Sequence, residues 1–223
     1  MSRFCARLLI FVCLLPACSG LPVLQPAPDI GAPVAADACR AVFPTGKWQF
    51  VHTIDALLPD GSERQMMGVT VADAPGRTLA CALLTVEGFV LFRARMDPAV
   101  RVERAVPPFD KKGFADGLLN DLRLLFLPPA AAETRIGRLV GGGFPEKPEA
   151  CRYIEKEGAV TDVIPGSRWR VYRYSPHGYL VRTVTAEAAG GREGFPGRLT
   201  LQAPGLAGYT LVMTLVEAAR INH

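Results

Sequence analysis

From Lys47 onward, apolar and polar residues alternate in short runs that are separated by turn sequences. The run KWQFVHTI places Trp48, Phe50, His52 and Ile54 on one face and the intervening residues on the other. Such alternation is typical of a β-strand with one buried side. The turn sequences PDGS, APGR, EG and PHG join neighbouring runs as hairpins. We therefore expect a meander-like antiparallel sheet of about nine strands.

Eight further runs share this strand pattern. They cover residues 64–73, 78–86, 89–97, 100–106, 167–175, 179–187, 197–204 and 209–218.

One stretch in the middle of the chain has a different period. Between Phe114 and Phe126 the apolar residues recur at helical spacing, which predicts an amphipathic helix with Asp121 and Arg123 on its polar side. Asp110 can cap its start, and Pro128 ends it. A mainly β fold with this α insert is best packed as a curved sheet with the helix across its open side.

Two shorter segments follow the predicted helix. We interpret residues 130–140 as a second short helix and the three glycines at 141–143 as a flexible loop or hinge.

The first 17 residues predict a secretory signal peptide. Arg3 and Arg7 precede an apolar run from Leu8 to Leu15, which is about half the length of the ~20 residues that span a bilayer. The following LPAC sequence, which ends at Cys18, resembles a bacterial lipoprotein cleavage box. In such lipoproteins the cysteine carries a diacylglycerol and a further acyl chain, so Cys18 is the predicted lipidation site and the link to membrane lipid.

The alternative is ordinary signal cleavage near Ala17 or Gly20, which leaves Cys18 as a free thiol. Under the lipoprotein interpretation, resemblance to enterobacterial sorting rules makes Ser19 a residue that favours the outer membrane. We then expect a lipid-anchored protein on the periplasmic face of that membrane.

Residues 18–44 combine this cysteine with five prolines and show no apolar periodicity. That composition predicts a partly extended tether of roughly 30 Å or more. The folded domain is expected at residues 45–223.

The charge and the cysteines limit the function further. The net charge is +4, and about +2 without the leader arginines, which is too weak to argue for nucleic acid. Beyond Cys18, the mature chain keeps Cys39, Cys81 and Cys151. Cys81 lies in an apolar strand pattern, so Cys39 and Cys151 are the best candidates for one disulfide in an oxidising compartment.

No motif in the sequence predicts catalysis. There is no nucleophile elbow, phosphate loop or zinc-ligand spacing, so no enzyme activity, metal or cofactor is expected. His52 on its apolar face is more often a satisfied core residue than a catalyst. A hydrolase would need His52 or His177 beside a Ser or Cys and an acid.

Two groups of arginines follow predicted strands, either as a solvated outer face or as a basic rim for anionic lipid headgroups. They are Arg93, Arg95, Arg101 and Arg104, and Arg168, Arg170 and Arg173.

The order of lipoprotein box, proline-rich segment, strands, GLLNDLRLLFLPP helix and further strands resembles the LolA/LolB-like lipoproteins. More narrowly, it resembles a group often encoded beside aryl-polyene or fatty-acyl biosynthesis genes, on the motif that contains Asp121, Leu122, Leu124 and Pro128. The resemblance implies an incomplete antiparallel β-barrel covered by lid helices, with a hydrophobic cavity for acyl chains. LolB uses an exposed loop leucine, and no leucine of this sequence is assigned that role.

The leading hypothesis is a non-enzymatic carrier or acceptor of lipid-like molecules, whose lid opens near residues 141–143. Its partners would be a hydrophobic lipid or acyl ligand and a periplasmic carrier protein. The alternative is a structural or assembly lipoprotein with a filled core. The predicted ligand-binding residues are Trp48, Phe50, Phe92, Phe114, Leu118, Leu122 and Phe126.

Overall fold

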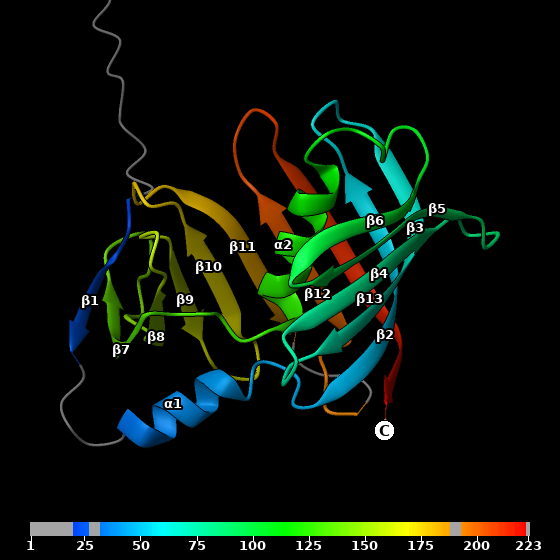
Figure 1. Ribbon diagram of the computed structural model, residues 1–223. Coiled ribbons are helices and arrows are strands. Elements are labelled where there is room, and N and C mark those ends of the chain that lie inside the picture. Colours follow the sequence, from blue (N-terminus) through cyan, green and yellow to red (C-terminus); the bar gives the residue numbers. More distant parts are fainter. Residues whose placement is uncertain (1–19, 27–31, 188–192, 222–223) are drawn as a thin grey trace, which may run out of the picture.

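The computed structural model describes residues 20–26, 32–187 and 193–221. All of its strands form one antiparallel sheet in the order β1-β7-β8-β9-β10-β11-β12-β13-β2-β3-β4-β5-β6. The sheet is strongly curved (Figure 1). It does not close, because β1 and β6 are its two free edges. The predicted signal peptide and Cys18 lie outside the described residues.

The helices are α1 (Ala32–Arg40) and α2 (Phe114–Phe126). The strands are β1 (Val23–Pro26), β2 (Lys47–Leu57), β3 (Glu63–Asp73), β4 (Thr78–Leu84), β5 (Val90–Asp97), β6 (Ala99–Ala105), β7 (Glu133–Val140), β8 (Glu149–Ile154), β9 (Val160–Ile164), β10 (Arg170–Tyr174), β11 (Leu180–Glu187), β12 (Arg198–Ala203) and β13 (Tyr209–Arg220).

Nine strands, β2–β6 and β10–β13, correspond to the nine predicted runs. The helix predicted at residues 130–140 is wrong, because Glu133–Val140 is strand β7, paired with β1 and β8. A short helix gains little on its own, so pairing on both sides outweighs the local preference of the alanines at 130–132. The three glycines at 141–143 form the turn between β7 and β8, and are not an α2 hinge.

The extended tether predicted for residues 18–44 is wrong for the described part of that segment. Val23–Pro26 pairs with β7, and α1 packs against β7 and β8. A disulfide joins Cys39 to Cys151, with 6.3 Å between their Cα atoms, which is the pair that the sequence favours. Backbone pairing and a covalent bond thus hold a segment that lacks an apolar pattern.

Gly137 allows β1 to reach the sheet. A Cβ atom at this position would lie 2.2 Å from the backbone oxygen of Gln25 in β1. We expect Gly137→Ala to release β1, at a cost of about 1 kcal/mol, because a clash with backbone is relieved only when the strand itself moves away. Hydrogen exchange should show lost protection of the β1 amides and retained protection in β2 and β13.

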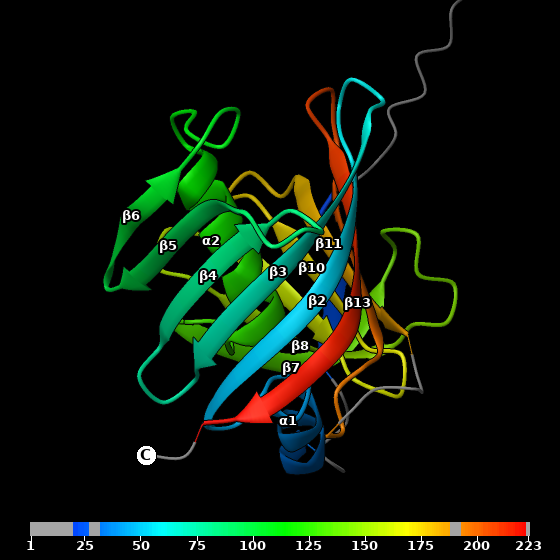
Figure 2. The same cartoon turned by 90° about the vertical axis from the view of Figure 1, so that its right-hand side faces the viewer.

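Helix α2 lies across the concave side of the sheet, where it packs against β4, β5 and β6. Figure 2 shows these strands curving around it. The helix begins after Gly113, whose φ of 83° suits glycine, so Asp110 is not its cap as predicted. It ends before Leu127, which is extended ahead of Pro128.

Candidate functional site

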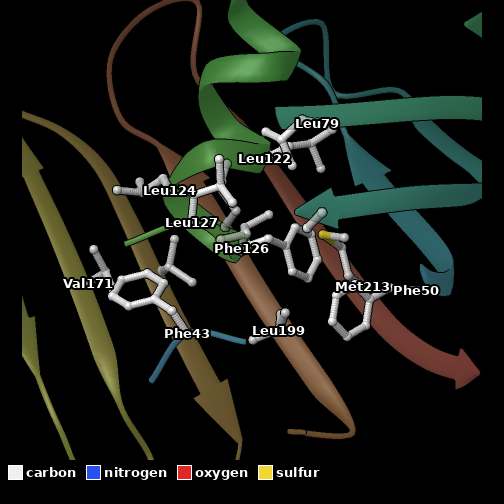
Figure 3. Close-up of a cluster of buried hydrophobic side chains, with 14 of the residues drawn as sticks. Phe43, Phe50, Leu79, Leu122, Leu124, Phe126, Leu127, Val171, Leu199 and Met213 are labelled. Carbon is white, nitrogen blue, oxygen red and sulfur yellow. The ribbon is translucent and has the colours of Figure 1, made fainter. Parts of the chain in front are cut away.

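The concave face under α2 is apolar. The underside of the helix buries Leu119, Leu122, Leu124, Leu125 and Phe126 at helical spacing. Figure 3 shows side chains of this helix and of the following Leu127 among Phe50, Leu199 and Met213 of the sheet. The helix thus covers the main hydrophobic core.

Aromatic rings fill the space between helix and sheet. Phe126 stacks on Phe50 with 4.8 Å between ring centroids, and Phe195 meets Phe50 edge-on at 4.9 Å. At the other end of α2, Phe114 meets Phe92 edge-on at 5.1 Å. Such contacts add about 0.5–1.5 kcal/mol each beyond the burial of area.

The structure brings all seven predicted ligand-binding residues into this one core. Phe50, Phe92, Leu122 and Phe126 are buried, while the other three are half-buried and pack against them: Trp48, Phe114 and Leu118. Of these residues, Phe50 and Phe126 line a void of about 20 Å³, which is too small for an acyl chain. Within the described residues, α2 therefore occupies the place expected for an acyl chain.

His52 lies on the floor of this void, at 2% exposure. Its ring centroid is 5.9 Å from that of Phe126, and its Nδ1 has no hydrogen-bond partner among the described residues. Burial lowers the pKa of His52 to about 4, because the charged form cannot be hydrated there. His52 is a core residue, as the sequence suggests, but it is not a satisfied one.

Asp121 anchors the inner side of α2 to the sheet. The Nε of Arg182 in β11 donates to its Oδ1 at 2.7 Å, and the Tyr209 hydroxyl of β13 donates to its Oδ2. Burial and then the Asp121 carboxylate raise the pKa of Tyr209 above its usual range. We call these three residues the Asp121 network. The sequence placed Asp121 on the polar side of the helix, and this is wrong, because the carboxylate is buried with partners from two strands.

A polar cleft of about 260 Å³ opens beside the C-terminal half of α2. Its walls are α2, residues 127–130 and strands β10 and β11, with Arg77 of the β3–β4 turn at its rim. Four arginines line this cleft: Arg77, Arg123, Arg173 and Arg182. Sequence reasoning missed it, because these residues lie far apart along the chain.

The first predicted arginine group lies together on the convex face. Arg93 is opposite Arg104, and Arg95 is opposite Arg101, in the β5–β6 pair. All four are exposed, and only Arg95 has a carboxylate neighbour among the described residues, Glu103 at 3.5 Å. In the second group Arg173 departs from the predicted outer face, since it lines the concave cleft.

One end of the sheet carries exposed apolar residues. The β2–β3 and β12–β13 hairpins project side by side there (Figures 1 and 2). Leu206 at the tip of the second hairpin is fully exposed, and Leu57 is about half exposed.

The described residues show no arrangement typical of a catalytic or metal site. No three His, Cys, Asp or Glu side chains in these ranges gather to hold a metal ion. Nor does either described histidine, His52 or His177, form a hydrogen bond to a serine, cysteine or carboxylate there. No helix in the described part of the chain is long and apolar enough to cross a membrane.

Comparison with known proteins supports the fold. No family model matches the chain, and no curated protein matches it. A solved LolA superfamily protein from Nitrosomonas europaea aligns with a TM-score of 0.55 and 11% identity, over 87% of this chain and 95% of its own. A putative outer membrane lipoprotein-sorting domain from Vibrio parahaemolyticus aligns with a TM-score of 0.46 and 12% identity, over 83% and 90%. The mainly β, LolA-like open sheet covered by helix is therefore confirmed.

Proposed function

We propose that this chain is a non-enzymatic lipoprotein that binds or transfers lipid-like molecules at the periplasmic face of the outer membrane. The observation that carries the proposal is α2, an apolar-faced helix that covers the concave side of an open sheet. The LolA-like fold supports the same class of function. The ligand class includes acyl chains and aryl polyenes.

Binding requires α2 to move, because its own apolar side chains are buried against the concave face. An acyl chain would replace the leucine and phenylalanine contacts that the helix gives up. Each Å² of apolar surface kept from water contributes about 25 cal/mol, so helix and ligand compete for the same face with similar energies. Gly113, which precedes α2 at a φ of 83°, is the flanking residue best suited to bend, because glycine tolerates many backbone conformations.

The anchor in this proposal is Cys18. Acyl chains on one cysteine contribute about 0.8 kcal/mol per buried methylene, and more than one chain gives stable attachment. A periplasmic carrier protein would deliver the ligand, and the anchored domain would pass it to the membrane.

The second candidate is a structural or assembly lipoprotein. The side chains of α2 that pack into the core favour it, since a scaffold has no need of a cavity. The two candidates differ in whether α2 shifts on the sheet when a lipid is supplied.

Tyr209→Phe tests this difference. The variant removes one hydrogen bond to the Asp121 carboxylate and keeps the ring, so it should weaken the hold on α2 by about 1.5 kcal/mol. If α2 opens, the open population and the uptake of an apolar fluorescent dye should rise roughly tenfold. Exposed Tyr179→Phe is the matched control.

Native mass spectrometry of the purified chain should also show bound lipid. Unchanged dye uptake in Tyr209→Phe, together with a mass free of lipid, would contradict the carrier and favour the scaffold.

A further inference from the structure

The polar cleft beside α2 gathers positive charge from separate parts of the fold. Arg173 and Arg182 lie directly opposite each other in the β10–β11 pair. Arg123 comes from the last turn of α2, and Arg77 from the turn between β3 and β4. All four line a single concavity of about 260 Å³.

Two carboxylates neutralise half of this charge. Glu155 accepts two hydrogen bonds from Arg173, at 2.6 and 2.9 Å, and Asp121 accepts one from Arg182 at 2.7 Å. Arg173 and Arg182 are therefore fixed in place and electrically balanced.

The other two guanidinium groups are not balanced. Within the described residues, the Arg123 side chain has no hydrogen-bond or ion-pair partner, and Arg77 donates only to the carbonyl oxygen of Pro128, at 3.2 Å. The cleft thus holds an excess of two positive charges. Guanidinium groups bind phosphate through paired N–H donors, and a concave site screened from bulk water strengthens the attraction.

The cleft adjoins the apolar core. Leu124 and Leu127 line the cleft and also belong to the core beneath α2. At about 260 Å³ the cleft lies near the lower limit of ligand pockets, so it suits a headgroup better than a whole lipid. A chain beneath α2 and a headgroup in the cleft would be continuous.

We infer that this cleft binds a phosphate-class oxyanion, carried as the headgroup of the ligand, so that the ligand is an anionic amphiphile. This inference rests on the proposed lipid-binding function. The same arginine chemistry also suits free phosphate, and the experiment separates the two sources.

The test compares two lipids with the same oleoyl chain, lysophosphatidic acid and monoolein. Calorimetric titration uses the full chain carrying Cys18→Ser, which removes the predicted acylation site, with each lipid below its critical aggregation concentration. One or two charge-assisted hydrogen bonds should make lysophosphatidic acid bind at least tenfold more tightly. In Arg123→Gln this preference should fall below about threefold while monoolein binding stays the same. Arg104→Gln, on the exposed convex face and away from the cleft, should keep the preference for lysophosphatidic acid.

Each other outcome overturns the headgroup site, the lipid-binding proposal or both. Equal affinity for the two lipids, or a full preference retained in Arg123→Gln, would overturn the headgroup site and leave the lipid-binding proposal standing. Binding of inorganic phosphate that Arg123→Gln abolishes, with neither lipid bound, would identify free phosphate as the ligand and overturn the carrier. Absence of binding by every probe would overturn both.

Discussion

Arg152→Met should lower the free energy of unfolding by about 3–5 kcal/mol, because it leaves the buried Asp162 carboxylate without a counter-charge. Arg152 donates from Nε and Nη2 to the two oxygens of Asp162, both at 2.7 Å. Asp162 is 0% exposed, and burial raises its pKa despite this partner. Arg152 also donates to the Pro22 carbonyl at 2.9 Å, so its loss should loosen the N-terminal segment.

Urea unfolding at neutral pH measures this change. Arg138→Met is the matched control, since its ion pair with Glu149, at 3.6 Å in the neighbouring strands, is exposed and should contribute less than about 1 kcal/mol. A loss in Arg152→Met no larger than in the control would show that Asp162 is hydrated or protonated without penalty.

His52 should make the protein lose about 3 kcal/mol of stability as the pH falls from 6.5 to 4. The unfolded chain binds a proton near pH 6.5, while the buried ring resists protonation until about pH 4. Protons therefore favour the unfolded state between about pH 4 and pH 6.5. At higher pH the destabilisation due to His52 vanishes. The free-energy penalty of protonation comes from one side chain beneath α2, so its size also reports how little water reaches that space.

His52→Leu should remove this part of the pH dependence. The unfolding free energy of His52→Leu minus that of the unaltered chain should be larger at pH 4.5 than at pH 7.5. The exposed His177→Gln should behave as the unaltered chain does. Identical pH profiles for His52→Leu and the unaltered chain would mean that the ring is protonated without penalty in the folded state.

The periodic parts of the sequence predicted the structure well, for a physical reason. β2 and α2 each bury one face, so their sequences carry the period of their backbone. β9 carries no such signal, because all five of its residues are buried. β1 and α1 are held by pairing and a disulfide, which leave no apolar pattern to read.

The site was only partly predictable. Apolar spacing identified Phe50, Leu122 and Phe126 as residues that meet on the concave face. The same spacing placed Asp121 on the solvent-facing side of the helix, because a carboxylate on an amphipathic helix is ordinarily solvated. In the structure its side chain is buried instead. Arg77, Arg123, Arg173 and Arg182 become neighbours only once the strand order is known.

Under the proposed acylation of Cys18, the bond from Arg152 to the Pro22 carbonyl would set how far the domain can stand from a bilayer. Only three residues lie between Cys18 and Pro22, and even a fully extended chain over these four steps reaches no more than about 14 Å. An acylated Cys18 would therefore hold the body of the protein against its own membrane, with little freedom to turn. Such a molecule would act where it is attached, and a ligand from the opposite membrane would have to be brought to it.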